Sequence, residues 1–133
     1  VFRGANTGLD ELTTTDANQV WIVSGGSVTP TEFDARESLG MASSSIEDLA
    51  GGEAAENAAV ARDVLSGGGA DAVRDAVALN VGTGILAWEG LENPVTQADF
   101  EERMRGAVER ALGTLADGSG ARLIERWVAA SNA

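Results

Sequence analysis

Every strand that the sequence predicts lies in the first 33 residues, and about four helices fill the rest of the chain. Gln19–Val23 is rich in β-branched and aromatic residues, which is typical of a strand. Val28–Phe33 predicts a weaker strand at a sheet edge, because Pro30 cannot donate to a ladder. The apolar start at Val1 predicts the end of a buried strand. Three strands offer four helices little area to cover, so we expect an α/β sheet completed by further strands on the N-terminal side.

The segment Ser24–Ser27, between the two later strands, contains the pair Gly25-Gly26. A glycine pair between two extended runs predicts a tight hairpin turn, and we favour this over a loop that cradles a phosphate. Residues 34–45 show no clear period, so we expect an irregular connection there.

The helical part begins after a second glycine pair. The first helix is predicted from Glu53 to Ser66 and is ended by three glycines. Four of its residues share one face at helical spacing: Ala54, Ala58, Ala61 and Leu65.

The second helix is predicted from about Ala70 to Trp88 and is apolar on nearly every side, which indicates a buried helix. Asn80 in its middle is interpreted as a satisfied structural group without chemistry. Gly82-Thr83-Gly84 resembles part of a phosphate loop. It lies inside a helical pattern with no strand directly before it, so we favour close helix packing through small residues.

Thr96 predicts the N-cap of the third helix, with Asp99 three residues on. A strong apolar stripe follows: Phe100, Met104, Ala107, Val108, Ala111, Leu112 and Leu115. After a break at residues 117–120, the last helix carries Leu123, Ile124, Trp127 and Val128 on one face and ends near Ser131. We expect Trp127 to anchor this helix in the core.

Asp10 and Glu11 follow the first strand through a loop punctuated by Gly4, Asn6 and Gly8. Ligands of open α/β sheets bind just outside the carboxyl ends of strands, and two carboxylates there can share Mg²⁺ with substrate phosphates. Acidic pairs in loops are also common as solvated turns. The pattern alone therefore leaves two interpretations, a magnesium site or an exposed turn.

The charge and the absent residue types exclude several classes of function. The chain has 9 basic and 21 acidic residues, a net charge of −12, which argues against binding nucleic acids or anionic membranes. It has no His and no Cys, so zinc sites, thiolate nucleophiles and His-based acid/base catalysis are excluded in this chain. No signal-peptide pattern and no membrane-length apolar run is found, which predicts a cytoplasmic protein.

Four segments in order carry a family resemblance. Gly8-Leu9-Asp10-Glu11-Leu12 resembles a Gly-Leu-Asp-Glu motif, and Asp48–Ala58, Val73–Asn80 and Glu125–Ser131 follow it. Together they resemble anthranilate phosphoribosyltransferases, in particular actinobacterial members. The resemblance implies that residues 1–133 are the C-terminal segment of that family's nucleoside phosphorylase/phosphoribosyltransferase-like α/β domain.

The family transfers phosphoribose from phosphoribosyl pyrophosphate (PRPP) to anthranilate in tryptophan biosynthesis. The resemblance implies that Asp10 and Glu11 bind Mg²⁺ on the pyrophosphate, and that the full-length enzyme is a homodimer. It assigns no catalytic acid or base here, and the anthranilate-binding residues lie upstream in the family. The family's N-terminal helical domain and its glycine-rich phosphate loop are not in this chain. Arg3-Gly4 also stands where the family often has His-Gly.

Two alternatives stay open. A pyrimidine-nucleoside phosphorylase shares the broader fold, but it would use inorganic phosphate and would not need an acidic pair for Mg²⁺. The chain could also be a fragment, or one subunit of a split protein, with no activity of its own. Because its phosphate loop and anthranilate site are missing, we expect the isolated chain to be inactive.

Overall fold

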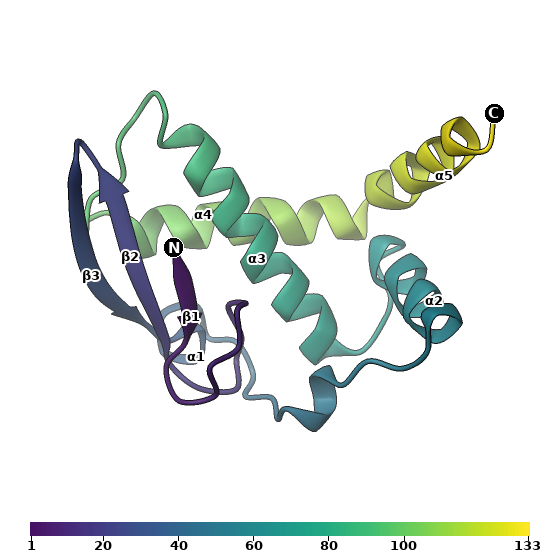
Figure 1. Cartoon of the computed structure of the whole chain (residues 1–133), viewed down its shortest axis with the longest axis horizontal. Helices are drawn as coiled ribbons and strands as arrows, with labels where there is room; N and C mark the ends of the chain where they lie inside the picture. Colours follow the sequence, from purple (N-terminus) through teal and green to yellow (C-terminus); the bar gives the residue numbers. More distant parts are fainter.

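The computed structural model describes all 133 residues, and its three strands precede all of its helices (Figure 1). The strands are β1 (Phe2–Gly4), β2 (Asn18–Ser24) and β3 (Ser27–Phe33), and they form one antiparallel sheet in the order β1-β2-β3. The α/β fold class predicted from the sequence is therefore confirmed.

The hairpin between β2 and β3 has the turn that the glycine pair predicts. Gly25 and Gly26 both have positive φ angles, of 56° and 77°, which is the requirement of a two-residue type I′ turn. The pairing runs from Ser24 opposite Ser27 to Asn18 opposite Phe33. β3 lies at the edge of the sheet, as its proline predicts.

β1 is present, but the prediction that it is a buried strand is wrong. Val1, just before it, is 78% exposed, and Phe2 is only half-buried. The reason is its position: β1 pairs with β2 on one side and leaves its other edge free.

The helices are α1 (Ala35–Leu39), α2 (Ala54–Leu65), α3 (Asp71–Glu89), α4 (Phe100–Ala116) and α5 (Ser119–Ser131), with a 3₁₀ turn, η1, at Glu47–Leu49. The four longer helices lie where the sequence predicts them, except that α4 begins at Phe100 with Asp99 and not Thr96 as its N-cap. None of the helices combines the length and the apolar character needed to cross a lipid bilayer.

Helix α1 falls inside residues 34–45, for which the sequence predicts an irregular connection, and that prediction is wrong for the five residues of α1 and right for residues 40–45. Asp34 caps its start by accepting the Arg36 N–H at 2.9 Å, and Gly40 ends it with a φ of 71°. A five-residue helix is too short to show a helical period, so only these caps could have revealed it.

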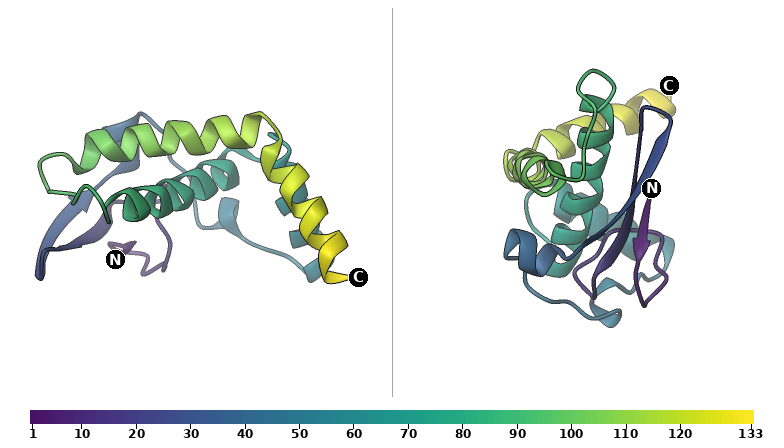
Figure 2. Two further views of the ribbon diagram at one scale, coloured as in Figure 1. Left: turned by 90° about the horizontal axis from the view of Figure 1, so that it is seen from above. Right: turned by 90° about the vertical axis from the view of Figure 1, so that its left-hand side faces the viewer.

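Helices α3 and α4 pack against each other and cover one face of the sheet (Figure 2). We call the sheet and the loop between β1 and β2, together with α1, α3 and α4, the central body. Gly82 permits the close approach of the two helices, because a Cβ there would lie 2.8 Å from Val108 Cγ2. This confirms the packing interpretation of the Gly82-Thr83-Gly84 segment at Gly82, but not at Gly84, where an added Cβ would meet no atom within 4 Å. The buried apolar residues of the body are Leu12, Val20, Ile22, Phe33, Ala35, Ala78, Leu79, Leu86, Phe100, Met104, Ala107, Val108, Ala111 and Leu115.

Helices α2 and α5 extend beyond the central body, and we call them the distal pair (Figure 1). The predicted apolar face of α2 is mostly exposed, and only Val64 of this helix is buried. No residue of α5 is buried, and Trp127 is 68% exposed. The prediction that Trp127 anchors the core is therefore wrong, because α5 follows the end of α4, and its main contacts are with α2 and α4 and not with the sheet or α3.

Helix α3 is less buried than its nearly all-round apolar sequence predicts. Leu79 and Leu86 lie in the core, but Val81 is 45% exposed and Trp88 is 76% exposed. The sheet and α4 cover one side of α3 and leave its other side open to solvent.

Candidate functional site

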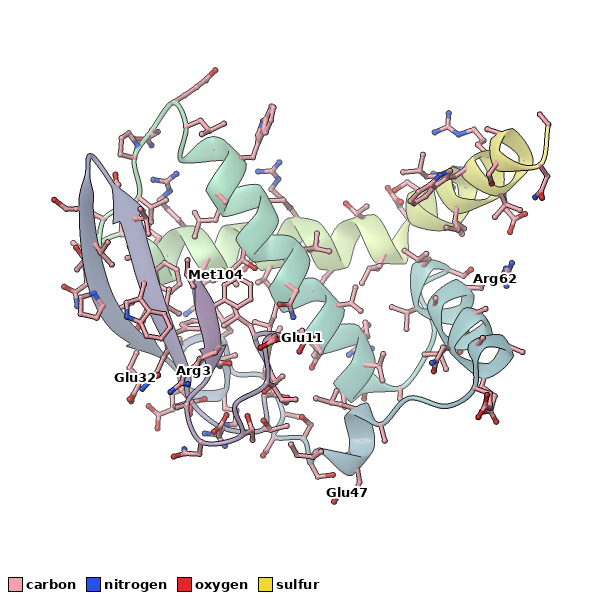
Figure 3. The ribbon with its side chains drawn as sticks, in the orientation of Figure 1. Arg3, Glu11, Glu32, Glu47, Arg62 and Met104 are labelled. Carbon is pink, nitrogen blue, oxygen red and sulfur yellow. The ribbon has the colours of Figure 1, made fainter.

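The two carboxylates singled out in the sequence lie at a bend between β1 and β2. Asp10 and Glu11 are both exposed, and none of the chain's ion pairs includes either of them. Figure 3 shows Glu11 beside α3. Both side chains are thus available to a ligand from outside the chain.

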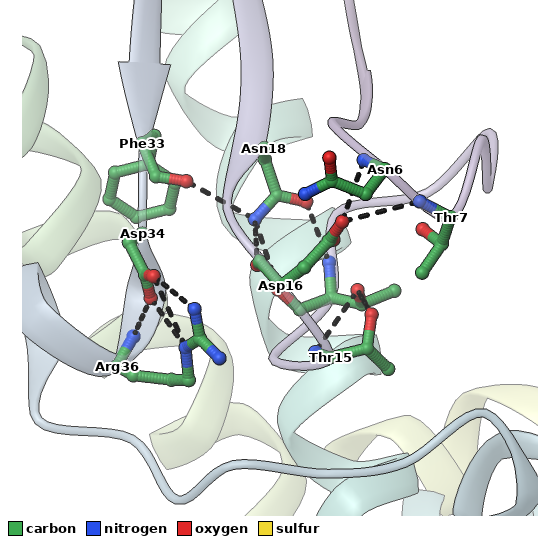
Figure 4. Close-up of polar contacts among 9 residues, drawn as sticks. Asn6, Thr7, Thr15, Asp16, Asn18, Phe33, Asp34 and Arg36 are labelled. Atoms are coloured by element: carbon green, nitrogen blue, oxygen red, sulfur yellow. Dashed lines mark hydrogen bonds and ion pairs between the residues drawn. The ribbon is translucent and has the colours of Figure 1, made fainter.

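The loop that carries the pair is closed at its base by backbone and carboxylate contacts. The Gly4 N–H donates to the Leu9 carbonyl at 2.8 Å. Asp16 Oδ2 accepts the backbone N–H groups of Asn6 and Thr7 at 2.7 and 3.2 Å (Figure 4). A side chain at Gly4 would collide with the loop, because its Cβ would lie 2.2 Å from Thr7 Oγ1. The first half of the loop therefore has a defined shape.

Two asparagines hold the residues that directly follow the acidic pair. Asn80 Oδ1 accepts the Leu12 N–H at 3.1 Å, and Asn80 Nδ2 donates to the Leu12 carbonyl at 2.9 Å. Asn18 repeats this pattern at the next residue, with 3.1 Å to the Thr13 N–H and 3.0 Å to the Thr13 carbonyl. The chain is thus fixed on both sides of Asp10 and Glu11, while the two carboxylates stay free.

A pocket of about 380 Å³ opens beside the pair, between the loop and the first half of α3. Glu11 is the only ionisable side chain that lines it, and Thr13 and Asn80 supply its other polar groups. The rest of the lining is apolar: Leu9, Leu49, Val73, Ala76 and Val77. One face of Glu11 therefore meets a concave surface and not only bulk solvent.

The donor set fits Mg²⁺ only in a particular way. No group of three or more His, Cys, Asp or Glu side chains in the chain could enclose a metal ion. Two exposed carboxylates are a poor cage for Ca²⁺, which takes six to eight oxygen ligands. They suit Mg²⁺, which commonly takes one or two carboxylates and completes its shell with waters and substrate phosphates. The residues therefore fit an ion that arrives with a phosphorylated ligand.

The carboxylates whose pKa values the structure lowers all lie outside this loop. The side chain of Arg36 lowers the pKa of Asp34, and the backbone N–H of Thr96 lowers that of Asp99. Both aspartates serve the start of a helix, α1 and α4 respectively. The lowered pKa values therefore belong to carboxylates with local structural roles.

Arg3, which stands where the resembling family often has His, lies on the sheet and not in the loop. Its Nε donates to Gln19 Oε1 at 3.0 Å, across the β1–β2 pairing. Figure 3 shows it beside the sheet. Arg3 thus belongs to the exposed side of the strand that leads into the loop.

Sequence reasoning named the acidic pair but missed the residues that hold it. The interpretation of Asn80 as a satisfied structural group is confirmed by its three hydrogen bonds, but the sequence does not show that two of them hold Leu12, and it does not single out Asp16. The signal for Asn80 was its isolation as a strongly polar residue in an otherwise apolar helix. Asp16 gave no signal, because its role depends on how the loop folds back.

The chain is similar in sequence to a known family and to named proteins. Residues 1–121 match the family described as "Glycosyl transferase family, a/b domain". A protein of Arthrobacter sp. (strain FB24) named anthranilate phosphoribosyltransferase is 45% identical over 129 residues, which are 97% of this chain and 35% of that relative.

Two further relatives with the same name agree. The protein of Nocardioides sp. (strain ATCC BAA-499 / JS614) is 44% identical over 98% of this chain and 36% of its own length. That of Nocardia farcinica (strain IFM 10152) is 42% identical over 99% of this chain and 38% of its own length. The chain thus spans little more than a third of the length of these relatives.

Proposed function

Because its first 121 residues match the family's α/β domain, the chain belongs to this glycosyl transferase family, and we propose that it is part of an anthranilate phosphoribosyltransferase. The observation that carries the proposal is the 45% identity, over 97% of the chain, to a relative of that name. The reaction would transfer phosphoribose from PRPP to the amine of anthranilate, a step of tryptophan biosynthesis.

In this proposal Asp10 and Glu11 hold the Mg²⁺ that accompanies the pyrophosphate of PRPP. Their exposure and their freedom from ion pairs support this role. Mg²⁺ bound there would stabilise the negative charge that develops on the departing pyrophosphate. The closed base of the loop would keep the two carboxylates in place before the substrate arrives, which favours catalysis by positioning and electrostatics.

The remaining parts of the site belong, in this proposal, to polypeptide outside residues 1–133. These parts are the glycine-rich phosphate loop, the anthranilate site and the N-terminal helical domain, and we expect the whole protein to be a cytoplasmic homodimer. Two features support a larger domain. β1 has a free edge, and Trp88 and Leu91 expose 76% and 75% of their surface at the end of α3 and just beyond it.

The metal role is tested in the intact protein by the double variant Asp10→Asn/Glu11→Gln, with PRPP and anthranilate as substrates. We expect the Mg²⁺ concentration for half-maximal rate to rise by about tenfold or more, on the scale of lost metal-site contacts. High Mg²⁺ should recover part of the rate, because weakened metal affinity obeys mass action.

The matched control is Glu101→Gln/Glu102→Gln, which neutralises an adjacent exposed pair on α4. It should leave the Mg²⁺ dependence unchanged. If both double variants respond alike, the effect is one of net charge, and the metal role of Asp10 and Glu11 is wrong.

The competing proposal, a pyrimidine-nucleoside phosphorylase, requires different substrates. A nucleoside phosphorylase would convert a pyrimidine nucleoside with inorganic phosphate and would not use PRPP. Assays of the intact protein with each pair of substrates separate the two proposals. The isolated 133-residue chain should be inactive in both assays, and formation of phosphoribosylanthranilate by the chain alone would contradict the division of the site proposed above.

A further inference from the structure

Asn80 is the one side chain of α3 that bonds to the backbone just after the acidic pair. Its amide makes two contacts with Leu12, at 3.1 Å to the N–H and 2.9 Å to the carbonyl. A third contact, from Nδ2 to the Ala76 carbonyl at 2.8 Å, lies within the helix itself. An asparagine amide has two N–H donors and one carbonyl oxygen, so one N–H serves Ala76, while the other N–H and Oδ1 both serve Leu12.

These two bonds act directly on Glu11. The Leu12 N–H belongs to the peptide group that joins Glu11 to Leu12, and this group is planar. Fixing that N–H therefore fixes the plane in which the Glu11 Cα lies. Leu12 itself is fully buried, so its side chain holds the same point from the other side.

We propose that Asn80 is a positioning residue for the proposed magnesium site: it holds Glu11, the neighbour of Asp10, at the wall of the pocket that Glu11 and Asn80 both line. The inference rests on the proposed function and adds a residue to it. Asn80 touches neither the metal nor the substrate in this proposal. It acts through the Glu11–Leu12 peptide.

An asparagine side chain that makes two hydrogen bonds to the backbone of one residue does not by itself indicate a functional role. Asn57 makes the same pair of contacts with Gly52, both at 2.8 Å, at the start of α2. The two cases differ in the neighbours of the residue that the asparagine bonds to, Leu12 or Gly52. Leu12 follows the two free carboxylates, whereas Gly52 precedes only the cap of a helix. Asn57 is therefore a matched control.

The test variant is Asn80→Ser in the intact protein. A serine hydroxyl in a helix commonly bonds to the carbonyl four residues earlier, so it can replace the contact with Ala76 but cannot reach Leu12. Loss of an outer contact of a metal site typically lowers metal affinity or activity about 10- to 100-fold. We expect the Mg²⁺ concentration for half-maximal rate with PRPP to rise within this range, with most of the rate recovered at saturating Mg²⁺.

Binding gives a second measurement that does not depend on turnover. Calorimetric titration with inorganic pyrophosphate at several Mg²⁺ concentrations should show a matching loss of Mg²⁺-dependent affinity in Asn80→Ser. Asn57→Ala should change neither the Mg²⁺ dependence of the rate nor pyrophosphate binding. Thermal unfolding of each variant confirms that it is folded under the assay conditions.

The outcomes separate the two claims. An unchanged Mg²⁺ dependence in folded Asn80→Ser, or an equal shift in Asn57→Ala, overturns the positioning role and leaves the proposed function intact. A uniform fall in rate that saturating Mg²⁺ does not relieve also overturns it, because the residue would then support the fold and not the metal site. Wild-type protein without PRPP-dependent activity overturns the proposed function itself.

Discussion

The central body and the distal pair are built from similar helices but differ in what those helices contact. In the body, α4 buries six of its residues against α3 and the sheet, including Phe100, Met104 and Val108. In the distal pair, α5 buries none, and α2 buries only Val64. The one ion pair between α2 and α5, Arg62 with Glu125 at 3.9 Å, is exposed and adds little.

This difference shows that an amphipathic stripe identifies the face of a helix that can be buried, but does not show whether another surface packs against that face. α5 is the most sharply amphipathic helix of the chain, yet it is the least buried. Leu123 and Trp127 expose 55% and 68% of their surface on that face. Burial therefore depends on a partner surface, which the central body supplies to α4 and not to α5.

The largest expected effect lies in the core of the central body. Phe33 is 1% exposed and meets the Phe100 ring edge-on at a centroid distance of 5.5 Å. Phe33→Ala should lower the free energy of unfolding by about 3–5 kcal/mol, measured by urea titration of the chain. A loss below about 1 kcal/mol would show that the body is no better packed than the distal pair.

The contact between α3 and α4 gives the next effect. Gly82→Ala would place a methyl group 2.8 Å from Val108 Cγ2 and should lower the free energy of unfolding by about 1–3 kcal/mol. Gly84, on the same helix, has no atom within 4 Å of such a methyl group. Gly84→Ala should raise stability by about 0.5–1 kcal/mol, and equal effects at both sites would contradict the close helix contact.

The start of α1 should give a smaller effect that depends on pH. Asp34→Asn keeps a side-chain cap but loses the ionic contact with Arg36, and at pH 7 it should lower stability by at most about 1 kcal/mol. Arg36 lowers the pKa of Asp34 below its usual 3.8, so the unfolded chain binds this proton more readily. The stabilisation is thus complete above about pH 4 and is lost as the pH falls through the lowered pKa.

Urea titrations at pH 7 and at pH 3 or below would measure this loss. The difference between wild type and Asp34→Asn should shrink at the lower pH. A difference that stays constant or grows on acidification would show that the carboxylate is not stabilised by Arg36.

The smallest effect is expected at the far end of the distal pair. Trp127→Ala should change the free energy of unfolding of the chain by no more than about 0.5 kcal/mol, because the side chain is 68% exposed. A loss above about 2 kcal/mol in the same urea titration would mean that a partner surface buries this face in solution.

The sequence predicted the elements of the fold well where local chemistry decides them. The glycine pair at residues 25–26 fixes the hairpin, and the stripe from Phe100 to Leu115 fixes α4. It failed where tertiary contacts decide. No local pattern shows that α5 has no core to enter or that β1 lies at an edge, since both depend on which neighbours are present.

The candidate site could also be predicted only in part, in its ligand residues but not in the residues that hold them. Two adjacent acidic residues after a strand can be read from the sequence, because the chemistry of a ligand set is carried by residue type. What holds them cannot, because Asn80 and Asp16 reach the loop only through the folded backbone. An isolated polar residue in an apolar helix is the one sequence signal that would have pointed to Asn80.

The grip of Asn80 on Leu12 also links the acidic pair to the order of folding. This contact joins residues 68 positions apart, whereas the contacts of Asp16 with Asn6 and Thr7 span 10 and 9 positions. Short-range closures lose less chain entropy and form sooner than long-range ones. The part of the loop that Asp16 closes onto Asn6 and Thr7 can therefore form early. The carboxylates of Asp10 and Glu11 reach their final position only when α3 packs against the loop. In native-state hydrogen exchange, the Leu12 amide should open only with global unfolding, and the amides of Asn6 and Thr7 through smaller fluctuations.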